Sequence, residues 1–330
     1  MDITTFGGPA PQRGVGVVAP FDFALDRELW RWTPEEVSLH LTRTPYVPVE
    51  VSVDMARLIS EHATLHSAVT ALDAVRPESF AYACTAGSFV GGIAQERAMC
   101  ASMSAAGRGR PAVTTSGALL EALRELGAHR VGVITPYTGS LTEALREYLA
   151  EAGVEVVGCQ YMGLTGEIWK VAYREVVDLA RAADLTRADC LFVSCTNLPT
   201  YDVIPQLEAE LRLPVISANQ VTMWAALRNA GVRPVGDYQS LVDPSARAAL
   251  DAYRRAPEPI VTTFPEPFAP PAPEPLPEPA AEPFAEAVAE PFAEAVAAPE
   301  PEPAGCDLRT PHLPAQPPVP DETEPGTEPN

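Results

Sequence analysis

Two cysteines occupy matching positions in two similar segments of the sequence. Residues 80–88 read FAYACTAGS and residues 191–200 read LFVSCTNLPT, so each segment is an apolar run that stops at Cys-Thr. A thiolate is a strong nucleophile and a usable base when its pKa is lowered. Backbone N–H groups and the dipole at the start of a helix lower it. Cys84 and Cys195 are therefore candidate catalytic residues.

The polar residues that follow each cysteine suit the binding of an anion. Backbone N–H groups and short polar side chains stabilise a carboxylate or a developing enediolate, and the candidates here are Thr85, Ser88, Thr196 and Asn197. Two such halves facing each other hold a small dicarboxylate or amino acid and act on opposite faces of one carbon. Racemisation, cis–trans isomerisation through a covalent adduct, and decarboxylation with stereospecific protonation all need this arrangement.

A single buried cysteine after a strand is more often a packing residue than a catalyst. We interpret Cys100, Cys159 and Cys190 in this way, because each lies within an apolar element with no polar loop beyond it. The repetition of the Cys-Thr element favours catalysis for the other two. Their common context also predicts an internal repeat, in which a strand ending in Cys-Thr leads into a helix and then a further strand.

Short apolar runs alternate with amphipathic helical stretches along most of the chain. Continuous apolar strands that alternate with helices indicate parallel sheets covered on both faces. The pattern predicts an α/β fold of two pseudo-symmetric lobes, each a mainly parallel sheet flanked by helices, with the site in the cleft between them. The predicted strands are 14–19, 80–83, 131–134, 154–159, 190–193 and 215–217, and the predicted helices are 56–75, 87–103, 115–126, 141–152, 167–183, 201–211 and 220–230.

The composition changes sharply near residue 257. Of the 74 residues from 257 to 330, 22 are proline and 15 are Asp or Glu, against one basic residue, Arg309. The segment EPFAEAVA occurs at 282–289 and again at 290–297. Such a composition buries little apolar surface, so we expect a disordered acidic tail that acts as a spacer or binds an unknown protein. The expected catalytic domain is 1–256, and Cys306 in the tail is incidental.

Several functional classes do not fit the sequence. No apolar stretch approaches the roughly 20 residues of a membrane helix, and no signal peptide is apparent, so we expect a cytoplasmic protein with reduced cysteines. The spacing of the cysteines predicts neither a disulfide framework nor a zinc site. A net charge of −21, with Lys170 as the single lysine, argues against nucleic-acid binding.

The sequence resembles the maleate cis–trans isomerase family of the Asp/Glu racemase superfamily, which includes arylmalonate decarboxylase and ectoine-utilisation proteins. The resemblance rests on YACTAGS, on GAHRVGVITPY at 127–137 and on SCTNLPTYDVIPQLEAELRLPVISANQVTMW, and it covers about residues 12–235. It implies two α/β lobes and a site between them that uses no metal or organic cofactor.

The resemblance also implies roles for single residues. Cys84 matches the cysteine that acts as nucleophile or base, and Cys195 matches the general acid. Tyr137 matches a tyrosine that hydrogen-bonds a substrate carboxylate, and Thr85 matches the anion-binding threonine. Asn219 either supports the cleft or caps the helix that follows it.

The sequence departs from the isomerase pattern at two positions. The family's substrate-binding asparagines correspond to Phe23 and to a position near Gly166. Phe21 and Phe23 would make the pocket apolar, which suits a substrate with one carboxylate and a hydrophobic or cationic arm. We expect Asp22 to face solvent or cap a turn. In the strand and loop expected within residues 30–46, His40 and Arg43 are either carboxylate ligands or surface residues.

The sequence therefore predicts a cofactor-independent two-cysteine isomerase of a small carboxylic acid, similar to maleate isomerase. An amino-acid racemase and an ectoine-utilisation or decarboxylase-like enzyme remain alternatives. A catalytically silent paralogue that binds a small acid is an alternative from another class. Homo-oligomerisation is left open.

Overall fold

The computed structural model describes residues 12–255, and the predicted tail, the domain boundary and Cys306 lie outside this range. The described chain contains two four-stranded sheets, whose strand orders are β2-β1-β3-β4 and β6-β5-β7-β8. All neighbouring strands are parallel. Because the second order repeats the first, the two halves are pseudo-symmetric, which confirms the predicted fold class.

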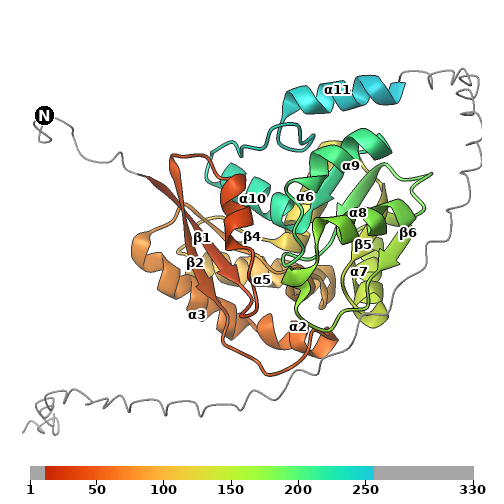
Figure 1. Cartoon of the computed structure of the whole chain (residues 1–330). Helices are drawn as coiled ribbons and strands as arrows, with labels where there is room; N and C mark the ends of the chain where they lie inside the picture. The colour runs from red at the N-terminus through yellow and green to blue at the C-terminus, as the bar shows by residue number, and fades with distance from the viewer. Residues whose placement is uncertain (1–11, 256–330) are drawn as a thin grey trace, which may run out of the picture. The chain divides into compact units, whose positions relative to one another are not determined.

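The first half supplies one sheet and its helices, drawn from red to yellow in Figure 1. Its elements are β1 (Arg13–Ala19), α1 (Asp26–Arg31), β2 (Val37–Arg43), α2 (Val53–Ile59), α3 (His62–Leu72), η2 (Asp73–Val75), β3 (Ser79–Tyr82), α4 (Thr85–Phe89), α5 (Gly92–Ala106), β4 (Ala112–Thr114) and α6 (Thr115–Leu126). In β1, six of the seven residues are buried, as expected of a strand covered on both faces.

The second half repeats this plan and ends in an additional helix. Its elements are β5 (Arg130–Thr135), α7 (Gly139–Glu151), β6 (Glu155–Tyr161), η3 (Ile168–Lys170), α8 (Tyr173–Ala182), β7 (Cys190–Val193), α9 (Val203–Leu211), β8 (Val215–Ser217), α10 (Ala218–Asn229) and α11 (Pro244–Arg255). Figure 1 shows α11 running along the outside of α9.

Helices α6 and α10 join the two halves. Each begins directly after the fourth strand of its sheet and is capped by that strand's last residue, Thr114 in one case and Ser217 in the other. The hydroxyl oxygens of Thr115 and Thr222 lie 2.7 Å apart across the helix pair. Because Ser217 caps α10, Asn219 does not have the capping role that the sequence left open.

Three predicted long helices are each interrupted. Residues 56–75 divide into α2 and α3, residues 87–103 into α4 and α5, and residues 167–183 into η3 and α8. The second break ends at Gly92, the first residue of α5, which has the left-handed conformation with a φ of 76°. The prediction of continuous helices was wrong here because the apolar spacing continues across breaks that turns and caps impose.

Among residues 12–255, no helix combines the length and hydropathy required to cross a membrane.

Candidate active site

Cys84 stands two residues beyond the end of β3 and is the N-cap residue of α4. Its Sγ accepts a hydrogen bond from the backbone N–H of Gly87 at 3.4 Å, and the residue is 5% exposed. A side chain at position 87 would collide with the hydroxyl of Tyr82 and approach Cys84 Sγ. The glycine in CTAGS is therefore needed for the turn that holds the thiol.

Cys195 stands two residues beyond the end of β7, the strand equivalent to β3. Its Sγ accepts a hydrogen bond from the backbone N–H of Asn197 at 3.4 Å, and the residue is 7% exposed. Its φ is 94°, a conformation that L-residues rarely adopt. Strained backbone of this kind persists only where the surroundings enforce it, and it concentrates at functional sites.

The two cysteines line the same cavity, as the internal repeat predicted. The cavity has a volume of about 30 Å³, enough for one or two water molecules. Its other walls combine apolar side chains from α2 and η3 with polar residues from three loops: Pro20, Asp22, Val51, Met55, Ile59, Thr85, Ala86, Tyr137, Ile168, Thr196 and Asn197. Any ligand larger than this needs these walls to move apart.

Three of the predicted binding residues, Thr85, Thr196 and Tyr137, line this cavity. The Oγ1 of Thr85 is buried without a hydrogen-bond partner among residues 12–255. In the same part of the chain, the backbone N–H groups of Thr85 and Thr196 have no acceptor. Tyr137 is buried in the cavity wall and packs edge-on against Phe89, with ring centroids 6.2 Å apart. These groups form a neutral cradle for one carboxylate.

Two other predicted binding residues have structural roles instead. Ser88 is absent from the cavity wall, and its Oγ donates to the carbonyl of Cys84 at 2.7 Å and lies 2.7 Å from Ser116 Oγ. Asn197 borders the cavity, but its Oδ1 accepts from Ala24 N–H at 2.9 Å and its Nδ2 donates to the carbonyl of Asp22 at 3.1 Å. The sequence predicted that both side chains bind substrate, but neither has a polar group free to do so.

The loop after β1 differs most from expectation. Asp22 lines the cavity, although we expected it to face solvent or cap a turn. Phe23 is buried outside the cavity wall, and Phe21 packs against Tyr46 with ring centroids 5.3 Å apart. Phe21 lines a neighbouring outer pocket instead, so the prediction that both phenylalanines line the pocket at the thiols was wrong. The apolar walls come from Val51, Met55, Ile59 and Ile168.

The remaining polar candidates lie away from the cavity. Arg43 donates to the carbonyl of Phe23 at 2.8 Å and pairs with Asp26 at 2.9 Å, so its guanidinium stabilises the loop after β1. His40 lies on β2, the edge strand of the first sheet, and is not part of the cavity wall.

Glu28, which the sequence did not single out, holds the loop that carries Cys195. This buried carboxylate on α1 accepts hydrogen bonds from the backbone N–H groups of Thr200 and Tyr201, each at 2.7 Å. Asn219 donates to it at 3.4 Å and to the carbonyl of Thr196 at 2.9 Å. Asn219 thus supports the cleft, one of the two roles proposed for it. The sequence feature that could have identified Glu28 is an acidic residue between Leu25 and Leu29 on a short helix.

Replacing Glu28 by Gln should lower kcat more than it changes KM. Hydrogen bonds to a charged acceptor contribute about 1.5–3 kcal/mol each, and an amide oxygen cannot accept all of those that Glu28 receives. We expect kcat to fall about 10- to 100-fold because Cys195 loses its fixed position. The exposed Glu35→Gln is the matched control. A Glu28→Gln variant with an unchanged kcat and a lower melting temperature would show that Glu28 is structural only.

Comparison with known proteins agrees with this arrangement of two lobes. Residues 62–240 match the family described as arylmalonate decarboxylase. The chain belongs to this family. It is 37% identical over 148 residues to arylmalonate decarboxylase of Bordetella bronchiseptica, over 44% of this chain and 61% of that enzyme.

Two solved structures of similar proteins extend the match over both halves. One is a liganded arylmalonate decarboxylase mutant with one cysteine introduced and another replaced; it has a TM-score of 0.65 and 26% identity, over 71% of this chain and 100% of that one. The other is the Nocardia farcinica maleate cis–trans isomerase with a covalently bound succinylcysteine intermediate. It has a TM-score of 0.62 and 25% identity, over 67% of this chain and 94% of that one. The family resemblance found in the sequence is confirmed.

Within this family fold, the thiols have pKa values opposite to those expected. Burial raises the pKa of Cys84 to about 12, although the Gly87 N–H and Tyr82 lower it. Burial likewise raises the pKa of Cys195 to about 12 against the effects of Tyr137 and the Asn197 N–H. Asp22 raises both pKa values further. A single N–H donor to each sulfur does not offset the cost of burying a thiolate, so both thiols are neutral in the closed cavity.

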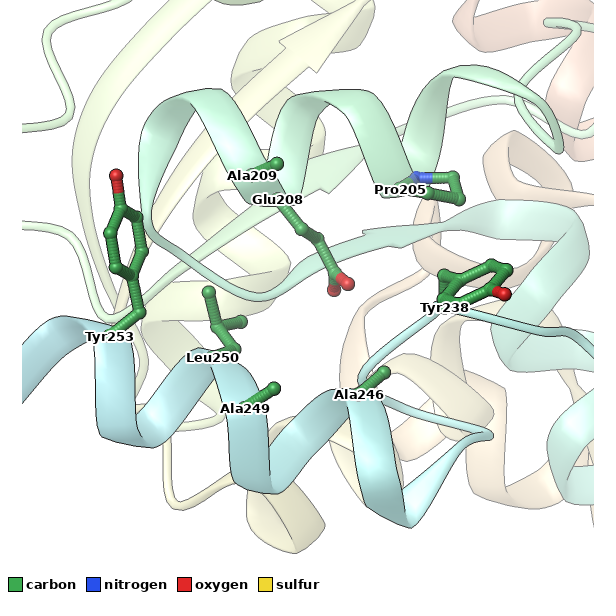
Figure 2. A pocket seen from close by; sticks show the side chains of 8 residues that line it. All are labelled: Pro205, Glu208, Ala209, Tyr238, Ala246, Ala249, Leu250 and Tyr253. Carbon is green, nitrogen blue, oxygen red and sulfur yellow. The ribbon is translucent and has the colours of Figure 1, made fainter.

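A larger cavity of about 370 Å³ lies between α9 and α11. Figure 2 shows the Glu208 carboxylate directed into it, with Tyr238 and Tyr253 at its two ends. The carboxylate accepts hydrogen bonds from Val215 N–H at 3.0 Å and Ser240 N–H at 2.9 Å, and burial raises its pKa to about 7. Within the part of the chain that the structure describes, no cysteine, histidine or basic residue lines this cavity. The cavity between the lobes is therefore the better candidate for the active site.

Proposed function

We propose that this chain is a two-cysteine isomerase of a small carboxylic acid, whose chemistry needs no organic cofactor. The proposal is carried by one observation: Cys84 and Cys195 reach a single cavity from equivalent positions in the two lobes. Membership of a family that includes decarboxylases and similarity to isomerases support an enzymatic role.

In the proposed mechanism, the Cys84 thiol is the nucleophile and the Cys195 thiol transfers a proton. As substrate binds, the Cys84 thiol gives its proton to solvent, and the proton returns after the product leaves. The resulting thiolate adds to one carbon of the substrate's double bond, and the π electrons move toward the carboxylate as an enediolate. The N–H groups of Thr85 and Thr196 and the Thr85 hydroxyl stabilise this charge. The former double bond is then single and rotates.

Elimination restores the double bond in the trans geometry and returns the electron pair to the Cys84 sulfur. During the lifetime of the adduct, Cys195 donates its proton to the carbanion carbon and takes it back before elimination. Atoms and electrons therefore balance without a redox partner. The succinylcysteine of the Nocardia isomerase shows that a cysteine adduct forms in a protein similar to this one.

Proton transfer without a covalent adduct is the second candidate function. The same pair of thiols can take a proton from one face of a carbon next to the carboxylate and deliver one to the opposite face, which racemises the substrate. Decarboxylation followed by protonation would use one thiol only. The 37% identity to arylmalonate decarboxylase over 148 residues supports this second candidate, a reaction that transfers a proton without a covalent adduct.

Proton NMR in deuterated water should separate these reactions. The panel contains small unsaturated monocarboxylates and dicarboxylates, chiral α-substituted acids and substituted malonates. When it is incubated with the full-length protein, we expect it to include one acid whose cis isomer converts to the trans isomer. Racemisation would instead exchange the α-hydrogen of a chiral acid for deuterium, and decarboxylation would give a product one carbon shorter. Conversion of no acid in any of these three ways would contradict the proposed function.

A further inference from the structure

The charge on the cavity wall restricts which acid the site accepts. In the part of the chain that the structure describes, Asp22 is the only carboxyl group on the wall, and no lysine, arginine or histidine lines the cavity. Nearby carboxylates have cationic partners, since Asp26 pairs with Arg43 and Asp202 pairs with Arg31. Among residues 12–255, the Asp22 carboxylate forms no salt bridge of this kind. A partly buried carboxylate without a cation is costly unless it is paired or protonated.

A second, outer pocket lies beside this cavity, and its wall is also acidic. It has a volume of about 330 Å³ and shares Asp22 and Val51 with the inner cavity. Its wall carries Glu50, Glu167 and the aromatic rings of Phe21, Tyr46 and Trp169 and, within residues 12–255, includes no basic residue, although Lys170 beside this wall forms an ion pair with Glu167. Acidic groups beside exposed aromatic faces attract cations. Asp22 thus stands where an acidic, aromatic pocket meets the two thiols.

We propose that the substrate is a small carboxylic acid that also carries a cationic amino group, and that Asp22 binds this group. The inference rests on the proposed function and specifies its substrate class. The substrate carboxylate would lie against the Thr85 and Thr196 N–H groups, which provide no formal charge. A dicarboxylate would place a second negative charge near Asp22 with no cation on the wall to balance it.

An ion pair between Asp22 and the ammonium group of the substrate would also help to activate the thiols. Asp22 raises the pKa of both Cys84 and Cys195. An ammonium group beside Asp22 cancels this effect and favours the thiolate, whereas a second carboxylate adds to it. The cationic substrate thus brings the charge that the cavity wall lacks.

Binding to a protein that cannot turn over substrate tests this inference directly. Full-length Cys84→Ser/Cys195→Ser protein is titrated calorimetrically with cis-4-aminobut-2-enoate and with maleate, two four-carbon cis acids that differ in the charge of one end. We expect the amino acid to bind at least about tenfold more tightly. Asp22→Asn should remove this preference, and Asp54→Asn, a change at an exposed carboxylate on α2, should keep it. The ratio of kcat/KM for the two acids in wild-type protein is a second readout that needs no cysteine variant.

Each result bears on one claim. Equal or tighter binding of maleate, an unchanged preference in Asp22→Asn, or no binding of the amino acid at millimolar concentration would overturn the inference. If one of these results is obtained and the wild-type protein still converts maleate in a cysteine-dependent reaction, the proposed function is kept and only the inference about Asp22 is rejected. Selective, Asp22-dependent binding of the amino acid without any turnover in wild-type protein would support the inference and reject the isomerase.

Discussion

Iodoacetamide will alkylate Cys84 and Cys195 slowly at neutral pH, and the rate will rise about tenfold with each pH unit up to pH 10. Both thiols have a pKa of about 12, raised from 9.0 by burial. Below that pKa, the thiolate fraction increases tenfold per pH unit, and at neutral pH it is about a thousandfold smaller than for an unperturbed thiol. Peptide mass spectrometry after timed alkylation measures each cysteine separately.

A small-molecule thiol in the same reaction is the control for reagent chemistry. Asp22→Asn should accelerate alkylation of both cysteines, because Asp22 raises their pKa values. Raised folded pKa values also mean that these thiols stabilise the fold below about pH 9 and lose that contribution as pH rises toward 12, so measurements stop at pH 10. A rate that levels off near pH 7 would show that the thiols are activated in the free protein.

Cys84→Ala and Cys195→Ala should each lower kcat about a thousandfold on any acid that the wild-type protein converts. A positioned nucleophile or proton-transfer group contributes roughly 10²- to 10⁴-fold, and the proposed mechanism uses both thiols in every turnover. Both residues lie in loops at strand ends, so we expect the variants to keep the wild-type circular dichroism spectrum.

Cys159→Ala is the matched control for this experiment. Cys159 is half-buried on β6 and does not line the cavity between the lobes, so its removal should leave kcat within about twofold of wild type. Full activity in either Cys84→Ala or Cys195→Ala would remove that thiol from the mechanism. Full activity in both would leave the family fold intact but reject the two-cysteine function.

Most of the correct predictions followed from the apolar strands and from the repeated Cys-Thr element. Strand β7 and helix α6 have the predicted bounds, because Cys190–Val193 is wholly buried and α6 ends at Gly127 in the left-handed conformation. The pairing of Cys84 with Cys195 followed from the same logic. Equivalent strands in two parallel sheets place their carboxyl ends at equivalent edges.

The direction of loop side chains was beyond what the sequence pattern reveals. Asp22 and Asn197 follow strands that were predicted correctly, yet Asp22 lines the cavity and Asn197 uses its amide to hold residues 22–24. Neither periodicity nor composition determines such contacts, since they join residues 173 and 175 positions apart. The buried carboxylate of Glu28 was missed for the same reason.

The position of Asp22 has a large energetic consequence for recognition. Two like charges 4 Å apart repel by about 4 kcal/mol at an effective dielectric constant of 20. A repulsion of that size is sufficient to reverse the preference between a dicarboxylate and an amino acid of the same length. If Asp22 binds substrate as proposed, similarity to maleate isomerases would not transfer their substrate to this chain, because the Asp22 carboxylate would repel a second carboxylate in the cavity.

The central claim, that the two thiols act as a unit on one substrate, is tested most directly by the kcat of the Cys84→Ala/Cys195→Ala double variant beside the two single variants. Residues that act in a single step show strongly non-additive losses. The two-cysteine mechanism predicts that the double variant is no more than about tenfold slower than either single variant. Losses that multiply, so that the double variant falls about a thousandfold below each single one, would contradict it.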